Sequence, residues 1–328
     1  MTATLDRAVE PLWPGGPVKV APHGLPRNQW LGTRKQGIGG SEVGAILGLD
    51  ERTSPLAVYM DKRDELPDDD AGEAAEWGNL LEPVVAAKWA GDHRMHVWSP
   101  GVLAHPDRPW QIANPDRFFL DPHARPASDP QPDGLLEVKT TNQYLDGDWD
   151  PDADRMPDRA RLQVQHYLDV TGLRLAHIAC LVGGQTLKVF TETYDAELAE
   201  MLRAACDRFW HDHVLAGHPP PIDGSKATTD LLGRLYDVPT EDIAVLNPSE
   251  VRPLVEARIA AKAAVKAAER HEALIDNQLK ALLGERQVGV VDGKPVLTWK
   301  QQTRAAYQAS ESTFRVLRVP KGALDALI

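Results

Sequence analysis

Cysteine, long apolar runs and positive charge are all scarce in this chain of 328 residues. Its two cysteines, Cys180 and Cys206, are too few for a disulfide framework or a cysteine metal cluster. No run approaches the roughly 18 apolar residues of a membrane span, and the start, MTATLDRAVEPLWPGG, lacks the basic and apolar regions of a signal peptide. We therefore expect a cytoplasmic protein with no membrane contact.

The charge balance excludes one class of DNA-binding protein. The formal net charge is −12, from 48 acidic and 36 basic residues. A protein that coats DNA without specificity would be basic, because it must neutralise phosphates. An enzyme with a local basic track, or one whose carboxylates hold divalent cations, is compatible with this acidity.

Composition and periodicity divide the chain into three parts. Residues 1–26 are rich in Pro and Gly without any period, which indicates a flexible arm. Over residues 27–224, helical and strand-like segments alternate, which indicates an α/β fold around a mixed central sheet. We expect helices at 41–49 (with Ser41 as N-cap), from Ser54-Pro55, and at 76–90, 157–171 and 195–216. We expect strands within 96–106, 110–120, 135–141, 175–184 and 186–194.

Residues 225–328 form an appendage with a different composition. The segment 249–283 is rich in Ala, Glu, Lys and Leu, and its apolar residues recur at helical spacing. A hairpin is expected over 287–300, with Asp292-Gly293 as a type I′ turn. The long helix could mediate oligomerisation, bind a partner or pack on the preceding domain.

The stretch GIGGSEVGAILG, from Gly37 to Gly48, resembles a phosphate-binding loop at first sight. The dinucleotide fingerprint fails because Glu42 stands where its third glycine should be. A P-loop fails because Ala45 and Ile46 replace its Lys and Ser/Thr. What is left is a glycine turn into a helix, with Ser41 and the upstream Arg34. This combination suits an anion, although a plain helix cap with a solvated arginine would give the same pattern.

The strongest chemical pattern is LLEVKT, in which Glu137 and Lys139 point to the same face of a predicted strand. A second acid, Asp116, lies upstream in Asn114-Pro115-Asp116. An acid after proline, a hairpin, and then acid-x-lysine resembles the order of the PD-(D/E)XK nuclease site, where two acids ligate Mg²⁺ beside a lysine. The alternative is a surface ion pair on one strand face.

Two flanking motifs add polar residues to this set. WGNLLEP places Glu82 on the helix before the sheet, and QVQHY carries Gln163 and Gln165 on a later helix. The two glutamines fall on different sides of that helix, so at most one fully faces a site. Exposed helical side chains are the alternative for each.

The motifs Arg34-x-x-GIGGSE, WGNLLEP, NPD, LEVKT and QVQHY, in this order over residues 27–223, resemble the lambda exonuclease/YqaJ-type viral recombinase family. That family belongs to the PD-(D/E)XK superfamily, so the resemblance implies a restriction-endonuclease-like core. It implies a Mg²⁺-dependent nuclease, with Mn²⁺ able to substitute, acting as a 5′-to-3′ exonuclease on linear double-stranded DNA in phage-type recombination. It also implies a homotrimer and a single-strand annealing protein as partner.

The resemblance implies a role for each matching residue. Asp116, Glu137 and the Val138 carbonyl would bind Mg²⁺, and Lys139 would orient or activate the water and stabilise developing charge. The remaining implied roles are Glu82 as an additional acid, directly or through a metal-bound water, Gln163 in support of the site, and Arg34 and Ser41 on DNA phosphate.

The chain departs from the family pattern beside Asp116. Arg117 stands where a glycine often follows the acid, and Asn114 stands where a small hydroxyl residue is usual. Arg117 puts the shape of the local backbone in question, and Asn114 receives no role.

Two other functions are compatible with the same motifs. One is a structure- or site-specific DNA endonuclease on the same core. The other is a catalytically silent DNA-binding or phage assembly protein, which the intact set Asp116, Glu137 and Lys139 disfavours.

Overall fold

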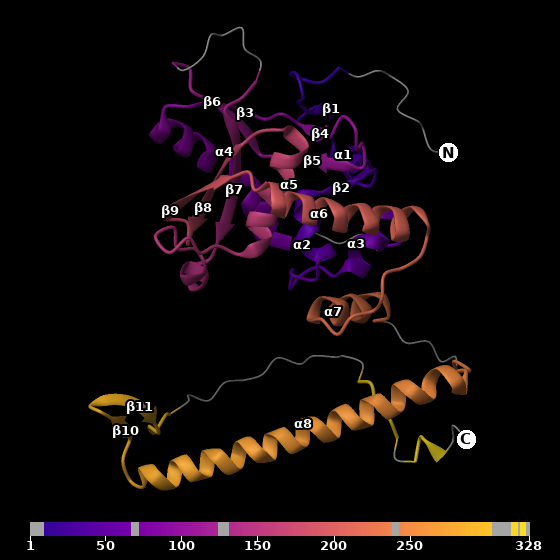
Figure 1. Ribbon diagram of the computed structural model, residues 1–328, viewed down its shortest axis with the longest axis vertical. Coiled ribbons are helices and arrows are strands. Elements are labelled where there is room, and N and C mark those ends of the chain that lie inside the picture. The colour runs from indigo at the N-terminus through magenta and orange to yellow at the C-terminus, as the bar shows by residue number, and fades with distance from the viewer. Residues whose placement is uncertain are drawn as a thin grey trace. The chain divides into compact units, whose positions relative to one another are not determined.

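The computed structural model describes residues 10–66, 72–123, 131–237, 243–303, 316–320 and 322–325 (Figure 1). The chain divides into two units, residues 1–235 and residues 236–328. In the part of the chain so described, no helix combines the length and apolarity needed to cross a membrane.

A five-stranded sheet forms the centre of the first unit, in the order β3-β6-β7-β8-β9. Only β7 and β8 run parallel within it, and the other neighbours are antiparallel. The strands are β3 (His96–Trp98), β6 (Arg117–Leu120), β7 (Gly134–Thr141), β8 (Leu175–Val182) and β9 (Thr186–Thr193). The predicted strand that carries Glu137 and Lys139 is therefore the middle strand of a mixed sheet.

A second sheet of four strands, in the order β1-β4-β5-β2, lies in the same unit. Each predicted strand at 96–106 and 110–120 is divided between the two sheets, so the expectation of one continuous strand in each segment was wrong. Pro100-Gly101 and Asn114-Pro115 break these segments, because proline cannot donate to a strand ladder. The strands are β1 (Val18–Ala21), β2 (Ile38–Gly39), β4 (Val102–Ala104) and β5 (Gln111–Ala113).

The flexible arm predicted for residues 1–26 is wrong for residues 10–26, and residues 1–9 lie outside the described part. Strand β1 pairs with β4 in an antiparallel register. Trp13 is buried, with its ring 5.7 Å from that of Phe118. Burial of this indole and pairing of β1 outweigh the local effect of Pro and Gly.

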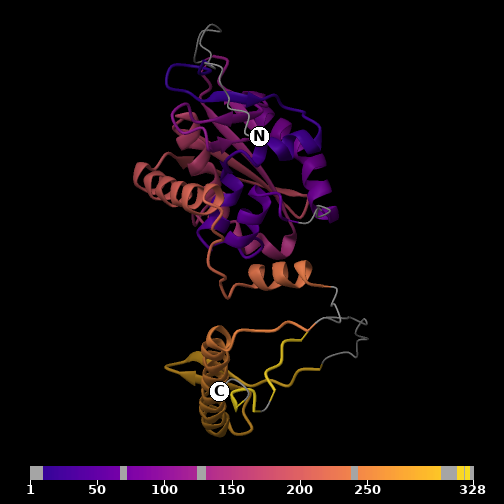
Figure 2. The same ribbon diagram turned by 90° about the vertical axis from the view of Figure 1, so that its right-hand side faces the viewer.

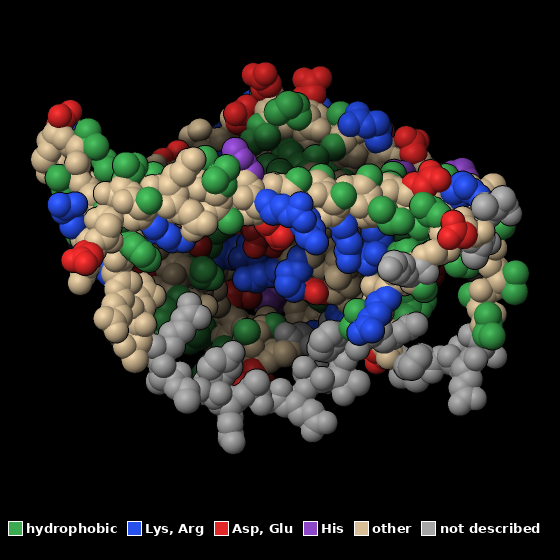
Figure 3. Space-filling model, turned by 90° about the horizontal axis from the view of Figure 1, so that it is seen from below, with side chains coloured by type: hydrophobic (Ala, Val, Ile, Leu, Met, Phe, Trp, Pro, Cys, Tyr) green, Lys and Arg blue, Asp and Glu red, His purple; other side chains and the backbone are tan. Residues whose placement is uncertain are grey.

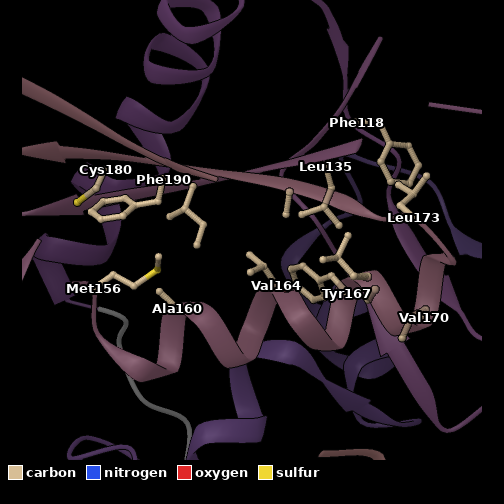
Figure 4. Packing of buried hydrophobic residues seen from close by; sticks show 14 of the residues in the cluster. Phe118, Leu135, Met156, Ala160, Val164, Tyr167, Val170, Leu173, Cys180 and Phe190 are labelled. Atoms are coloured by element: carbon tan, nitrogen blue, oxygen red, sulfur yellow. The ribbon is translucent and has the colours of Figure 1, made fainter. Parts of the chain in front are cut away.

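Helices cover both faces of the five-stranded sheet. Helix α5 (Asp158–Thr171) packs Ala160, Val164 and Tyr167 against one face (Figure 4). Helix α4 (Gly72–His93) packs Val85, Ala86 and Trp89 against the other. The remaining helices of this unit are α1 (Arg27–Arg34), α2 (Gly40–Ile46), α3 (Pro55–Lys62), α6 (Ala196–Arg208) and α7 (Lys226–Leu235), with a 3₁₀ segment at Gln143–Asp148 and a π-helical turn at Phe209–Leu215.

Helix α2 begins one residue before the predicted cap. Gly39, in extended conformation, is its N-cap, and Ser41 is already inside the helix. The Glu42 carboxylate accepts the Gly39 N–H at 2.8 Å, as the acid at the third helical position of a capping box does.

The second unit contains α8 (Pro248–Leu283), followed by β10 (Val288–Val291) and β11 (Lys294–Thr298). Figures 1 and 2 show the hairpin beside the C-terminal end of α8. Asp292 and Gly293 have φ of 51° and 76°, as a type I′ turn requires. The prediction of an α/β core with a mixed central sheet, followed by a long helix and a hairpin, is confirmed.

The surface of α8 carries many apolar side chains, visible as green atoms along the helix in Figure 3. Among the described residues of the second unit, Leu283 alone is a buried core residue. The exposed apolar residues of this helix are Leu254, Ile259, Val265, Leu274, Ile275 and Leu282.

The domain boundary predicted at residue 224 falls too early. Helix α7 comes after it, yet Ala227, Thr228 and Leu231 of α7 are buried and the helix contacts α3. The division into two units accordingly lies after Leu235.

Candidate active site

The polar residues predicted from five separate motifs lie around one cavity of about 420 Å³. Its walls come from α4, the start of β6, β7 and α5, because the middle strand ends between the two covering helices. The predicted residues that line it are Ser41, Glu82, Asp116, Glu137, Val138, Lys139 and Gln163. A larger cavity, about 840 Å³, is lined by residues of the second unit, and Asp325 is the only acid in its lining.

Glu137 is the centre of a hydrogen-bonded network between β7 and α5. Lys139 Nζ donates to Glu137 Oε1 at 2.7 Å and to Gln163 Oε1 at 2.9 Å. Gln163 Nε2 donates to Glu137 Oε1 at 2.6 Å and to the Tyr167 hydroxyl at 3.0 Å. The strand alternation thus places Glu137 and Lys139 on the face that α5 covers, as expected for residues two apart.

Asp116 reaches the same strand from the turn before β6. Its Oδ2 accepts the backbone N–H of Val138 at 2.7 Å. Asp116 follows Pro115, which ends the preceding strand and turns the chain toward β7. The carboxylates of Asp116 and Glu137 are therefore neighbours although 20 residues of chain separate them.

Arg117, which stands where the family pattern often has glycine, forms a hydrogen-bonded ion pair with Glu82. Its Nη1 donates to Glu82 Oε1 at 2.6 Å and to the Asp116 carbonyl at 2.6 Å. A glycine at this position could make neither side-chain contact. In this chain Glu82 therefore lines the cavity with one carboxylate oxygen already engaged.

Burial dominates the electrostatics of the acids. Burial, followed by the nearby Glu137 and Glu82 carboxylates, raises the pKa of Asp116 well above its ordinary value. Burial also raises the pKa of Glu137, although Lys139 opposes this change. For Lys139, burial lowers the pKa, but Glu137 and Asp116 outweigh it and the net direction is upward. The lysine is thus an ammonium ion at neutral pH.

A hard divalent cation fits this set of donors. Glu137 Oε2 is buried and has no hydrogen-bond partner, and an unpaired buried carboxylate oxygen is costly unless a cation or proton meets it. Asp116 and the Val138 carbonyl add oxygen donors, which Mg²⁺ prefers. Within the described ranges no three His, Cys, Asp or Glu side chains form a ready metal cage, so waters or substrate oxygens would complete the coordination.

Arg34 and Ser41 lie together, as predicted, but with partners that the sequence analysis missed. Arg34 Nη2 donates to Ser41 Oγ at 3.2 Å and to Glu42 Oε1 at 2.8 Å. The buried Lys62 donates to the same Glu42 oxygen at 2.7 Å and to the Arg34 carbonyl at 2.7 Å. The spacing of Val58, Tyr59 and Lys62 on one helical face could have indicated that this lysine is buried.

The two glutamines separate as the helical pattern predicted. Gln163 belongs to the cavity, whereas Gln165 donates to the Thr193 carbonyl at 2.8 Å and accepts the Asp195 N–H at 3.0 Å. Tyr167 and Arg159, which were not predicted as site residues, lie four residues on either side of Gln163. That spacing of one helical face was a signal for both.

Fold and site together define a mixed α/β protein with Glu137 and Lys139 on its middle strand and Asp116 hydrogen-bonded to that strand. Residues 29–174 match the YqaJ-like viral recombinase domain. The uncharacterized protein YqaJ of Bacillus subtilis is 30% identical over 280 residues, which cover 84% of each chain. The chain belongs to the YqaJ-like viral recombinase family.

Two solved structures are similar in part. An alkaline exonuclease from Laribacter hongkongensis is 16% identical, with a TM-score of 0.48, over 58% of this chain and 94% of that one. A phage-related exonuclease from Haemophilus somnus is 10% identical, with a TM-score of 0.41, over 55% of this chain and 96% of that one. Both scores lie below 0.5, so the family assignment rests on the sequence relative.

Proposed function

We propose that this protein is a DNA nuclease that hydrolyses phosphodiester bonds with Mg²⁺, for which Mn²⁺ can substitute. The observation that carries the proposal is the buried, unpartnered Oε2 of Glu137, next to Asp116 and Lys139 in an open cavity. A purely structural ion pair would have no reason to leave this oxygen unsatisfied. Membership in a viral recombinase family supports DNA as the substrate.

The residues divide the work by charge. Glu137, Asp116 and the Val138 carbonyl would hold the cation, and Glu82, fixed by Arg117, would act on it directly or through water. When bound, Mg²⁺ would supply Lewis acidity toward the phosphate and lower the pKa of a bound water. Gln163 keeps Glu137 and Lys139 in place through one hydrogen bond with each.

Lys139 serves as a cation and hydrogen-bond donor. Its raised pKa keeps the ammonium protonated, so it can orient a water molecule and stabilise negative charge that develops on the phosphate. This state disfavours Lys139 as the base that removes a proton from water.

The finer assignment is a 5′-to-3′ exonuclease on linear double-stranded DNA, with Arg34 and Ser41 at the terminal phosphate. Ser41 supports this assignment because it lines the cavity that contains the acids, and its hydroxyl accepts a hydrogen bond from the Arg34 guanidinium. A homotrimer and a single-strand annealing partner stay predictions of the family resemblance.

Digestion of three DNAs with Mg²⁺ tests the proposal: linear duplex with a 5′-phosphate, the same duplex without it, and a covalently closed circle. We expect the phosphorylated linear DNA to be degraded fastest and the circle to survive. A Glu137→Ala/Lys139→Ala variant should leave all three intact. Cleavage of the circle would support the endonuclease instead.

The chain contains its own matched control for the acid-x-lysine pattern. Lys294 stands two residues after Asp292 in the exposed hairpin turn, so Lys294→Ala should cut DNA as fast as the wild type. If the Glu137→Ala/Lys139→Ala variant were as active as Lys294→Ala, the cavity would not be the active site. Absence of cleavage by the wild type with every divalent metal would favour a silent DNA-binding protein.

A further inference from the structure

Two arginines line the candidate active-site cavity and have no role so far. Arg159 lies in the first turn of α5 and is half-buried, while Arg52 is exposed in the segment between α2 and α3. Both also line an adjoining cavity of about 400 Å³. They therefore lie in the part of the wall that the two cavities share.

Neither guanidinium forms a hydrogen bond or an ion pair with any residue in the described ranges. Burial and then the charge of Arg52 lower the pKa of Arg159, and the nearest acids, Asp50 and Glu51, offset this only in part. Two like charges without a bonded carboxylate repel each other. A phosphate oxygen that accepts from either guanidinium would relieve this repulsion.

The stem of Arg159 is fixed in place by the packing of α2 on α5. An atom added at the Cα of Gly44 would lie 3.5 Å from the Arg159 Cβ, so the two helices approach closely here. The charge of Arg159 also acts on Lys139. The arginine pair and Lys139 are thus the cationic residues of a cavity whose other charged lining residues are acids.

Arg34 cannot supply this positive charge alone. Its guanidinium already donates to Glu42 at 2.8 Å, and Glu42 also binds Lys62 at 2.7 Å. A phosphate at Arg34 would compete with a buried carboxylate, whereas a phosphate at Arg159 would meet unpaired donors. The two arginine positions are therefore electrostatically different.

We propose that Arg159, with Arg52 beside it, binds a phosphodiester group of the DNA strand that adjoins the phosphate cleaved at Asp116 and Glu137. The inference rests on the proposed function for its substrate, DNA. Guanidinium groups suit this ligand because they form bidentate hydrogen bonds to phosphate oxygens. This contact would set the register of the strand against the acids.

The test measures the Kd for a 5′-phosphorylated oligonucleotide duplex in metal-free buffer, where no cleavage occurs. Fluorescence anisotropy reports the binding at salt concentrations between about 50 and 200 mM. Arg159→Gln should raise the Kd about tenfold, as the loss of a charge-assisted hydrogen bond does. It should also flatten the plot of log K against log salt by about 0.7–0.9. Arg159→Lys should retain the slope, and Arg52→Gln/Arg159→Gln should flatten it further.

Arg208→Gln is the matched control, because Arg208 is an exposed arginine on α6 that does not line either cavity. Equal Kd and slope for Arg159→Gln and Arg208→Gln would overturn the inference, and thermal melting checks that both variants fold.

The cleavage assay separates the two proposals. If the wild type cuts no DNA but Arg159→Gln raises the Kd and flattens the salt dependence, the nuclease proposal is refuted and the phosphate site is retained. If the wild type cuts DNA and Arg159→Gln changes neither the Kd nor the slope, the nuclease proposal is retained and the phosphate site is refuted.

Discussion

The two buried carboxylates of the cavity are unfavourable as charged groups until a cation neutralises them. Asp116 and Glu137 both have pKa values raised by burial, so their ionised forms are unfavourable in the protein without metal. Lys139 offsets the charge of Glu137 through a direct hydrogen bond, whereas Arg117 donates to the carboxylate of Glu82 and not to that of Asp116. The site is thus incomplete in charge, which is typical of functional sites.

Asp116→Asn should separate stability from metal binding. A raised folded pKa means that the stability from Asp116 is complete below its unfolded pKa, about 3.8, and is lost as pH rises through the folded value. In metal-free buffer at about pH 7 the variant should melt roughly 2–4 °C above the wild type. The amide can still accept the Val138 N–H, so thermal melting should show an intact fold.

The same variant should respond differently to Mg²⁺. The metal should raise the melting temperature of the wild type, because it binds only the folded chain, and should leave that of Asp116→Asn unchanged. Asp212→Asn, at an exposed position in the π-helical turn, is the control and should behave as the wild type. Equal Mg²⁺ shifts in all three proteins would exclude Asp116 as a ligand.

Asp169 gives the opposite dependence on pH. Burial would raise the pKa of Asp169, but hydrogen bonds from Arg203, Gln111 and Tyr194 lower it to about 2 from 3.8. Its stability is therefore present above the unfolded pKa and is lost as pH falls through the folded one. Asp169→Asn should reduce the free energy of unfolding by about 1–2 kcal/mol at about pH 7, allowing for the partial exposure of the arginines.

Urea unfolding at several pH values checks this prediction. The difference between wild type and Asp169→Asn should shrink as pH is lowered from 3.8 toward about 2. A difference that is constant over this range would show that lost packing, and not charge, causes the effect.

Among the elements, the contact of α2 with α5 positions the site. An atom added at the Cα of Gly40 would lie 2.7 Å from both the Gln163 carbonyl and the Tyr167 ring. Gln163 holds Glu137 and Lys139, so the closeness of these helices sets the geometry of the cavity. This is the structural reason for the third glycine in GIGGSE, Gly40.

Gly40→Ala should therefore destabilise the protein by about 1–3 kcal/mol, as overpacking does, and slow DNA cleavage by displacing Gln163. Gly39→Ala is the matched control: its added atom would have Glu42 Oε2 as nearest neighbour at 3.7 Å, and the φ of −93° suits alanine. Urea unfolding measures both. Similar losses for the two variants would mean that close helix packing is not what Gly40 provides.

For the whole molecule, stability comes from the first unit. All three clusters of buried apolar residues lie between Trp13 and Val214, and every candidate site residue lies in residues 1–235. A fragment of residues 1–235 should unfold cooperatively at the temperature of the full chain and should cleave DNA.

A fragment of residues 1–224 provides the comparison. It lacks α7 and therefore the buried side chains of Ala227, Thr228 and Leu231. Loss of this burial should lower the melting temperature by several degrees, at about 2–4 °C for each kcal/mol lost. Calorimetry distinguishes the two fragments. Equal melting temperatures would return the boundary to residue 224.

The sequence alone determined the features that depend on neighbouring residues. Period-two alternation identified β7 and put Glu137 and Lys139 on one face, and helical spacing identified α8 and separated Gln163 from Gln165. The Asp292-Gly293 turn follows from local backbone preference. The family resemblance added the order of the site residues along the chain and hence their meeting in one cavity.

Only the tertiary structure decided which distant groups meet. It divided the predicted strands at 96–106 and 110–120 between two sheets, paired β1 with β4, and joined Arg117 to Glu82 across 35 residues of chain. It also gave Arg34 a carboxylate partner and left Arg159 without one among the residues that the structure describes. These outcomes depend on three-dimensional pairing and on the cost of burying unpaired charge, which local patterns in a sequence do not encode.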